Sequence, residues 1–349
     1  MKRVLFFLLS VFFLLASASC RETPARTDTG IINYRKEMRT FIEEISAYAK
    51  NINSSFLIIP QNGQSVAWDK AADTDNDGVP SGIMDSVYTA AIDGTGREDM
   101  FYGYDTDDKA TPDDMRVYLS GICKKFLEQG KSVLSVDYCS SLSKISDSYA
   151  QNASHGFIGF AEPDRGLGMI PENSGYGSAF YPYNGNTNDT QFLSDAKNFL
   201  FLLNMSSKDG AGSELIKKIA ATDYDVVIMD AFINGGGMQY TTSLINELKT
   251  KAHGGRRLII AYMSIGEAED YRWYWNSSWV KGTVPTDSAP AWLDAVNPDW
   301  AGNYKVKYWN KDWQSLMYGN DSSYVKKILD AGFDGVYLDI VDAYEYYEE

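Results

Sequence analysis

Residues 258–263 read LIIAYM, an apolar run that is followed directly by the acidic stretch 264–270, SIGEAED. Apolar runs of this length are typical of strands that are buried on both faces of a parallel sheet. Seven further runs share this character, in chain order 56–60, 100–103, 133–137, 157–160, 199–203, 226–230 and 336–339. A ninth candidate, residues 304–309, alternates in polarity and lies in an aromatic-rich insertion.

Helical patterns separate these runs. The predicted helices cover residues 34–50, 111–130, 141–153, 212–221, 241–252 and 322–331. Strands that alternate with helices along the whole chain predict an α/β fold. Eight strands in this length fit a single (β/α)8 TIM barrel over residues 34–349, and a doubly wound sheet is the alternative.

The first 20 residues, MKRVLFFLLSVFFLLASASC, have the organisation of an export signal: two basic residues, an apolar run and small residues before a cysteine. The small residues that lead to Cys20 resemble a bacterial lipobox, so we expect residues 1–19 to be a lipoprotein signal peptide and Cys20 to be lipidated. An ordinary signal peptide is the alternative. Residues 20–33 are expected to form a flexible tether. The protein is therefore expected to be exported and to contact the membrane only through its lipid anchor.

The composition excludes several classes of protein. Hydrophobic residues make up 44% of the chain, which argues against a disordered protein, and the net charge of −15 argues against a nucleic-acid binder. The only two histidines, His155 and His253, both precede strands, so a multi-histidine metal site is excluded. The spacing of Cys123 and Cys139 predicts two thiols, because a helix and a strand separate their expected heights.

Carboxylates follow several of the predicted strands, at the end where TIM barrels hold their active sites. Each of them alone could simply meet solvent or cap a helix. Together with aromatic residues they suit glycoside hydrolysis, which needs two carboxyl groups. We predict Asp339 as the central carboxylate, Glu267 as its partner and general acid, and Asp230 as the reserve. Residues predicted to contact substrate are Asn62, Asp137, Tyr262, Glu269, Arg272, Trp275, Asp342 and Tyr344.

A second acidic motif lies at residues 73–78, DTDNDG. Asp73, Asp75 and Asp77 alternate before a glycine, as in the first half of a calcium loop. Met84 stands where the final glutamate is expected, and a solvated acidic turn is the alternative. A structural calcium ion is the only cofactor that the sequence suggests.

Long stretches of the chain resemble a known family. The segments that carry the resemblance are AYMSIGEAEDYRWYW (261–275), NPDWAGNYKVKYWN (297–310), GFDGVYLDIVDAYEYY (332–347), FLIIPQNG (56–63), DGTGREDMFYG (93–103), GFIGFAEPDR (156–165), AKNFLFLLN (196–204) and YDVVIMDAF (224–232). They are similar to barrel proteins of glycoside hydrolase family 114, the endo-α-1,4-polygalactosaminidases. The resemblance implies a TIM barrel that hydrolyses an amino-sugar polysaccharide.

The order of these segments differs from that of the family. Segments that resemble the family's first four strands come last here, which implies a circular permutation. Members of the family carry Glu-Pro-Asp-Asn where residues 337–340 read YLDI, so Tyr337 stands at the position of a family glutamate. We therefore expect a monomeric, lipid-anchored glycoside hydrolase that acts on a polysaccharide. The alternatives are a non-catalytic carbohydrate-binding lipoprotein on the same barrel and a metal-dependent hydrolase such as a deacetylase, which the scarcity of histidine disfavours.

Overall fold

A computed structural model describes residues 32–70, 73–74, 78–171, 182–204 and 212–348, and Asn33–Glu349 form one compact unit. The predicted signal peptide and Cys20 lie outside the described residues, as do Asp75 and Asp77 of the calcium candidate. Among the described helices, none combines the length and the apolar character that crossing a membrane requires.

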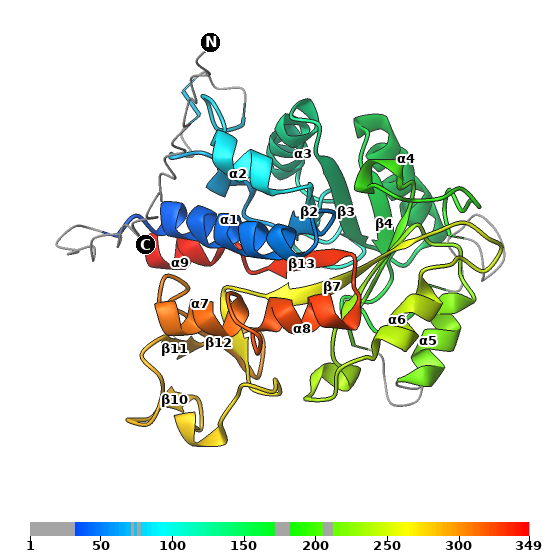
Figure 1. Ribbon diagram of the computed structural model, residues 1–349. Helices are drawn as coiled ribbons and strands as arrows, with labels where there is room; N and C mark the ends of the chain where they lie inside the picture. The colour runs from blue at the N-terminus through cyan, green and yellow to red at the C-terminus, as the bar shows by residue number, and fades with distance from the viewer. Residues whose placement is uncertain (1–31, 71–72, 75–77, 172–181, 205–211, 349) are drawn as a thin grey trace, which may run out of the picture. The chain divides into compact units, whose positions relative to one another are not determined.

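Eight parallel strands form the centre of the fold (Figure 1). They are β1 (Leu57–Pro60), β2 (Gly94–Glu98), β3 (Ser132–Tyr138), β4 (Ile158–Glu162), β5 (Phe199–Leu202), β6 (Val226–Asp230), β7 (Leu258–Ser264) and β13 (Gly335–Asp339). One sheet has the order β1-β13-β7-β6-β5 and a second has the order β2-β3-β4. The prediction of an α/β fold with a parallel sheet is thus confirmed.

The two sheets meet at both of their ends. On one side a parallel bridge pairs Gln61 with Gly96, and the Asn62 backbone N–H donates to the Gly96 carbonyl at 2.9 Å. On the other side the rings of Phe160 on β4 and Phe199 on β5 lie 5.4 Å apart. No backbone ladder joins β4 to β5 in the described residues.

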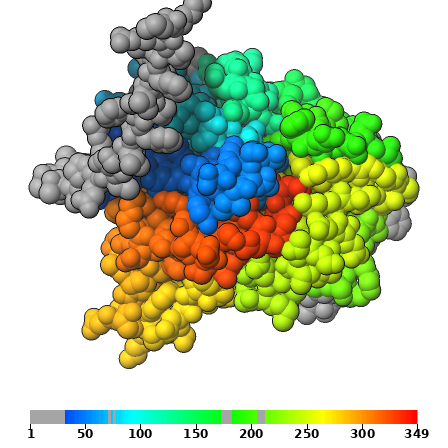
Figure 2. Space-filling view, viewed as in Figure 1, coloured from blue at the N-terminus to red at the C-terminus, as the bar shows by residue number. Residues whose placement is uncertain are grey.

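The first strand of the chain pairs with the last, Leu57 of β1 standing opposite Gly335 of β13. The helices next to these two strands in the sequence are α1 (Tyr34–Ile52), which precedes β1, α8 (Tyr324–Ala331), which precedes β13, and α9 (Ala343–Glu348), which follows β13. The Arg35 guanidinium on α1 forms an ion pair with Glu348 on α9 at 3.0 Å. Figure 2 shows the blue surface of α1 directly against the red surface of the C-terminal residues. The beginning and the end of this unit are therefore neighbours in space.

The remaining helices lie outside the strands. They are α2 (Ser86–Ala91), α3 (Asp113–Glu128), α4 (Leu142–His155), α5 (Ser213–Ala220), α6 (Thr242–Leu248) and α7 (Lys311–Met317), with 3-10 turns η1 (Gln64–Ala67), η2 (Leu193–Asp195), η3 (Ile233–Gly235) and η4 (Ser277–Trp279). All six predicted helices are present, with ends that differ by a few residues. The sequence pattern did not predict the short helices α2, α7 and α9.

One predicted strand is wrong. Residues 100–103 are not a strand, and the strand in this part of the chain is β2, Gly94–Glu98, a few residues earlier. The ninth candidate corresponds to β12 (Asn303–Val306), which pairs antiparallel with β8 (Glu267–Glu269) and β11 (Leu293–Val296). A two-stranded hairpin of β9 (Val280–Lys281) and β10 (Val284–Pro285) completes this insertion.

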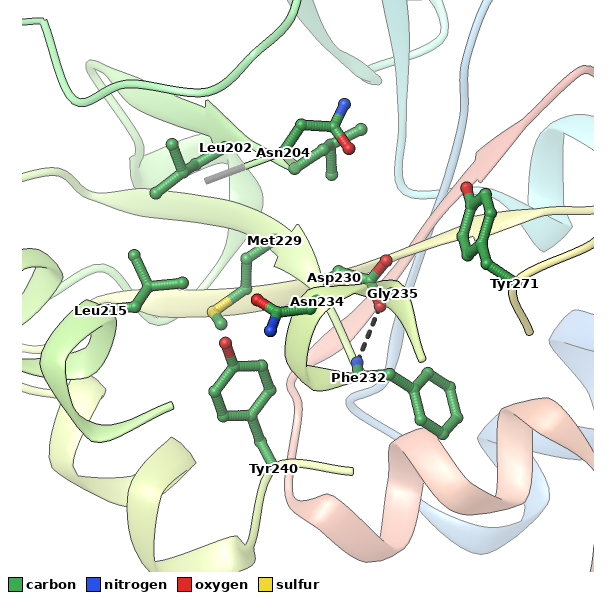
Figure 3. Close-up of a pocket in the computed structure, with 11 residues that line it drawn as sticks. Leu202, Asn204, Leu215, Met229, Asp230, Phe232, Asn234, Gly235, Tyr240 and Tyr271 are labelled. Atoms are coloured by element: carbon green, nitrogen blue, oxygen red, sulfur yellow. Dashed lines mark hydrogen bonds between the residues drawn. The ribbon is translucent and has the colours of Figure 1, made fainter. Parts of the chain in front are cut away.

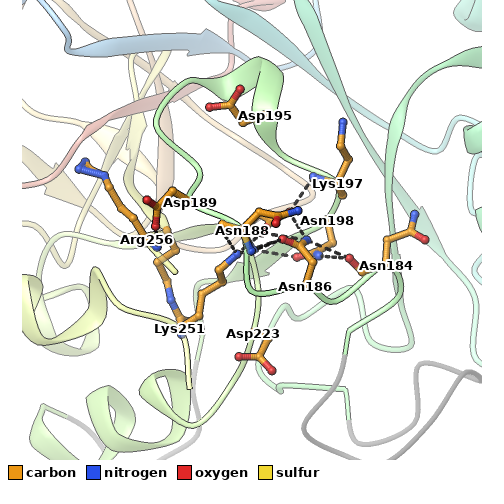
Figure 4. Close-up of polar contacts among 12 residues, drawn as sticks. Asn184, Asn186, Asn188, Asp189, Asp195, Lys197, Asn198, Asp223, Lys251 and Arg256 are labelled. Carbon is orange, nitrogen blue, oxygen red and sulfur yellow. Dashed lines mark hydrogen bonds and ion pairs between the residues drawn. The ribbon is translucent and has the colours of Figure 1, made fainter. Parts of the chain in front are cut away.

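A buried polar cluster at the N-terminal ends of the strands binds residues 184–198, the segment before β5, to the rest of the fold (Figure 4). The Lys251 ammonium pairs with Asp225, which directly precedes β6, at 2.8 Å, and it also donates to the side chain of Asn186 at 3.2 Å. Asn198, which directly precedes β5, accepts the Asp225 N–H at 2.8 Å. Each buried charge thus has hydrogen-bonding partners, as burial of an ion pair requires.

Both histidines precede strands, as the sequence predicted, and therefore lie away from the C-terminal strand ends. His155 is the last residue of α4, ahead of β4, and His253 precedes β7 and contacts Asp223 at 2.7 Å. Cys123 and Cys139 are buried free thiols.

Candidate active site

Side chains at the C-terminal ends of the strands line one cavity of about 430 Å³. Its polar and aromatic lining residues are Gln61, Asn62, Glu98, Tyr138, Arg165, Phe201, Asn204, Asp230, Tyr262, Glu269, Tyr271, Arg272, Trp300, Asn303, Asp339 and Asp342. Five of these are carboxylates and only two are guanidiniums. The cavity is therefore acidic, and it lies where parallel α/β folds hold their ligands.

Asp339 ends β13 and lies at the floor of this cavity. The Tyr262 hydroxyl donates to its Oδ2 at 2.5 Å, and the Ile340 backbone N–H donates to its Oδ1 at 2.8 Å. Burial and, after it, the nearby charge of Glu98 raise the pKa of Asp339 to about 8. The carboxyl group therefore holds its proton at neutral pH although it faces a cavity, which is the state that a general acid requires.

Glu98 ends β2 and is separated from Asp339 only by β1 in the order of strands. Asn62 donates to its Oε2 at 3.0 Å, and the Tyr138 hydroxyl donates to its Oε1. These two donors fix the orientation of the carboxylate, and Asn62 reaches it from the end of the intervening strand. Glu98 was missing from the predicted site because its strand was placed at residues 100–103.

Arg272 links two other carboxylates of the cavity. Its Nη1 contacts both oxygens of Asp230 at 2.9 and 2.8 Å, and its Nε donates to Glu269 at 2.5 Å. The Tyr271 hydroxyl also donates to Glu269. The Arg272 side chain is 1% exposed. Burial raises the pKa of Asp230, and the Arg272 charge opposes that rise. Asp230, Glu269 and Arg272 thus form a fully paired ionic cluster in the wall of the cavity, and neither carboxylate is a free acid.

Asp342 is a further carboxyl group at the edge of the cavity. Burial and then the charge of Glu345 raise its pKa to about 6. Of the residues predicted for the site, those that line the cavity are Asn62, Asp230, Tyr262, Glu269, Arg272, Asp339 and Asp342.

Glu267, expected beside Asp339, lies elsewhere, and this expectation is wrong. Its carboxylate is 1% exposed and is absent from the cavity lining. Lys305 contacts it at 3.2 Å and Asn297 donates to it at 2.9 Å, from the small antiparallel sheet. The chain leaves the parallel sheet after Ser264, so Glu267 faces β12 and not the neighbouring strand end.

Three residues predicted to contact substrate also lie outside the cavity lining. Asp137 is fully buried and accepts from the backbone of Phe101 at 2.7 Å and the hydroxyl of Ser148 on α4 at 2.6 Å. Trp275 packs on Tyr304, with ring centroids 4.9 Å apart. Tyr344 is fully buried, and its hydroxyl lies 2.6 Å from that of Ser65.

The calcium candidate is only partly described, because residues 75–77 lie outside the described part of the chain. Asp73 accepts the Gly78 backbone N–H at 2.9 Å, which is the geometry of an acidic turn. Among the described residues, no group of three or more His, Cys, Asp or Glu side chains could hold a metal ion.

The sequence of the C-terminal part matches a known family: residues 204–349 fit the model of glycoside-hydrolase family GH114. The match covers less than half of the chain. The matched part includes Asp230, Glu269, Arg272 and Asp339, and it excludes Glu98.

Proteins similar to this chain occur in archaea and bacteria. The uncharacterized protein MJ1477 of Methanocaldococcus jannaschii is 40% identical over 135 residues, or 38% of this chain and 35% of its own length. Uncharacterized proteins of Thermotoga maritima and Deinococcus radiodurans are 35% and 36% identical over 133 and 136 residues, which are 38% and 39% of this chain and 37% and 39% of theirs. Each match thus spans little more than a third of the relative.

Tyr337, which the sequence resemblance placed at the position of a family glutamate, does not line the cavity. It is fully buried, and its ring is 5.2 Å from that of Phe201. A Cβ atom on Gly96 would lie 1.8 Å from its hydroxyl oxygen, so the tyrosine occupies space that only a glycine leaves open.

Nine polar or aromatic lining residues were not predicted: Gln61, Glu98, Tyr138, Arg165, Phe201, Asn204, Tyr271, Trp300 and Asn303. Glu98, Arg165 and Trp300 all lie within the segments that resemble GH114 sequences, which was the available signal. Trp300 is 55% exposed and Tyr271 is 47% exposed, so both offer aromatic surface at the cavity.

Proposed function

We propose that the protein is an exported, lipid-anchored glycoside hydrolase that cleaves an amino-sugar polysaccharide. The observation that carries the proposal is the presence of two carboxyl groups in one cavity that differ in environment. Asp339 is buried and raised in pKa to about 8, whereas Glu98 accepts hydrogen bonds from Asn62 and Tyr138. Glycoside hydrolysis uses two carboxyl groups with separate roles, one as general acid and the other as nucleophile or general base.

Asp339 is the general acid in this proposal. Its proton passes to the glycosidic oxygen as the bond to the anomeric carbon breaks, which gives the leaving sugar a neutral hydroxyl group. The Tyr262 hydroxyl, 2.5 Å from Oδ2, stabilises the carboxylate that remains. A substrate that enters the cavity displaces water, which strengthens these contacts.

Glu98 is the second carboxylate. It attacks the anomeric carbon or takes a proton from the attacking water, and Asn62 and Tyr138 hold it in position. Because β1 alone separates β2 from β13, the two strand ends are about two interstrand spacings, roughly 10 Å, apart at the backbone. Side chains that extend inward from these strands can close this gap to the roughly 5–10 Å range of glycosidase pairs.

The surroundings favour a polymer of amino sugar. With Asp339 protonated, four other carboxylates against two guanidiniums in the cavity lining attract an ammonium group. Trp300 and Tyr271 are exposed at the cavity and offer flat apolar surface to the faces of sugar rings. The resemblance to polygalactosaminidases makes α-1,4-linked galactosamine the first substrate to test.

Release of reducing ends from galactosamine polymers tests this function. We expect Asp339→Asn and Glu98→Gln to lose activity by orders of magnitude while their melting temperatures show that they remain folded. Glu267→Gln is the matched control, because it makes the same change outside the cavity and should retain turnover. Activity that is lost in Glu267→Gln and kept in Glu98→Gln would contradict the assignment.

Substrates with good leaving groups separate the two roles. They need no proton from an acid, so they should rescue Asp339→Asn and not Glu98→Gln. Polymer binding without any release of reducing ends by the natural protein would instead identify a carbohydrate-binding protein.

The proposal also includes a closed barrel that is circularly permuted relative to the family. Pairing of β1 with β13 and the ion pair between Arg35 and Glu348 support it. A variant that joins residue 348 to residue 33 and begins at residue 182 should fold and unfold in one transition with near-native stability. Failure of that variant to fold would contradict the permutation.

A further inference from the structure

A second cavity of about 290 Å³ adjoins the acidic one (Figure 3). The two share the lining residues Leu203, Asn204, Asp230 and Tyr271. The second cavity, called the side pocket below, therefore adjoins the acidic cavity at these four residues.

The side pocket lacks the acidic character of its neighbour. Asp230 is the one carboxylate in its described lining, and both of its oxygens contact the Arg272 guanidinium, at 2.9 and 2.8 Å. Asp230 Oδ1 also accepts the Phe232 backbone N–H at 2.7 Å. Its charge is thus compensated inside the protein. Much of the remaining lining is apolar and comes from Leu202, Leu215 and Met229.

Neutral hydrogen-bonding groups complete the side pocket. Tyr240 is 4% exposed and belongs to the lining of the side pocket. Figure 3 shows its hydroxyl pointing into the pocket, on the side of Met229 and Asn234. The carboxamides of Asn204 and Asn234 belong to the same lining. Hydroxyl and carboxamide groups that line a pocket can donate hydrogen bonds to a ligand and accept them from it.

We propose that the side pocket is a specificity subsite for an N-acetylated sugar unit, next to an acidic cavity that takes a unit with a free amine. An acetamido group consists of a methyl group, a carbonyl acceptor and an N–H donor. Leu215 and Met229 match the methyl group. The Tyr240 hydroxyl and the Asn234 carboxamide NH2, a donor that an aspartate lacks, match the carbonyl, and the Asn204 carboxamide oxygen matches the N–H. This inference rests on the proposed function, and it makes a partly N-acetylated polymer the preferred substrate class.

Binding of defined tetrasaccharides tests the subsite. The probes are a fully deacetylated galactosamine tetrasaccharide and the four forms that carry one N-acetyl group, titrated calorimetrically into the mature Asp339→Asn protein so that none is cleaved. We expect one acetylated form to bind about tenfold more tightly than the deacetylated one, because a site built for a hydrogen-bonding group discriminates against its absence. Adding Asn234→Asp should remove this preference, and adding Tyr240→Phe should reduce it severalfold.

Asn184→Asp is the matched control. Asn184 and Asn234 have the same left-handed backbone, with φ of 57° and 54°, but the Asn184 carbonyl contacts Asn198 at the opposite end of β5. This variant should keep the preference. The subsite is refuted if no acetylated form binds more tightly than the deacetylated one, or if Asn184→Asp lowers the preference as much as Asn234→Asp. A clear preference without any hydrolysis by the natural protein would refute only the proposed function.

Discussion

Replacing Glu98 with glutamine should lower the pKa of Asp339 from about 8 by about one unit. Burial is the larger cause of the raised pKa, and the Glu98 charge is the next. With β1 between their strands, the two carboxyl groups are on the order of 10 Å apart. At that distance and an effective dielectric constant of about 20, two like charges repel by roughly 1.7 kcal/mol. This energy corresponds to roughly 1.2 pKa units.

Titration of carbon-13-labelled aspartate carboxyls by NMR measures this shift without any need for activity. The Asp339 signal is assigned by its loss in Asp339→Asn. Glu345→Gln is the control. The Glu345 charge is the nearby charge that raises the pKa of Asp342 most, whereas for Asp339 that charge is Glu98. This substitution should therefore lower the pKa of Asp342 and leave that of Asp339 in place. An unchanged Asp339 titration in Glu98→Gln would refute the coupling on which the proposed acid and base roles depend.

Three further predictions concern stability. The pKa of Asp339 is about 8 in the folded protein, whereas in the unfolded chain it has the usual value for an aspartate, about 4. Between these two values the folded state binds more protons than the unfolded state, so the free energy of unfolding falls as the pH rises from about 4 to about 8. Asp339→Asn cannot ionise, so it should raise the melting temperature more at pH 8 than at pH 4; equal shifts at both would contradict this reasoning. Arg272→Met leaves Asp230 and Glu269 as uncompensated buried charges and should cost about 3–5 kcal/mol in urea unfolding; a loss under about 1 kcal/mol would show that the charges do not depend on Arg272. Tyr337→Phe removes a buried hydroxyl that has no partner in the described residues, so it should raise stability by about 1 kcal/mol and keep the hydrolytic activity; loss of activity at full stability would place the hydroxyl in the chemistry.

Most strands and the long helices could be predicted from the sequence, because buried parallel strands read as apolar runs and the helices between them carry apolar faces. The run at residues 226–230 coincides with β6, and the aspartate that ends it lies at the cavity. The strand Gly94–Glu98 reads GTGRE and gave no such signal. Gly96 leaves room for the Tyr337 hydroxyl, so the reason for this glycine lies in a strand at the other end of the chain.

The direction of each carboxyl group was decided by the tertiary structure. Asp137 and Tyr138 are adjacent on β3, yet Asp137 faces α4 and Tyr138 lines the cavity. A strand that is buried on both faces has no polar alternation to distinguish these two sides.

The sequence pattern around each acidic residue also did not predict which of these residues lie together. Glu267 and Glu98 both follow or end a strand, but Glu267 is turned into an antiparallel insertion while Glu98 reaches the cavity that contains Asp339. The sequence by itself determined an alternating α/β chain with acidic strand ends and a GH114-like C-terminal part. Only the pairing of β1 with β13, between segments at opposite ends of the chain, brought Glu98 near Asp339, because residues so distant in sequence meet through backbone hydrogen bonds that no local pattern encodes.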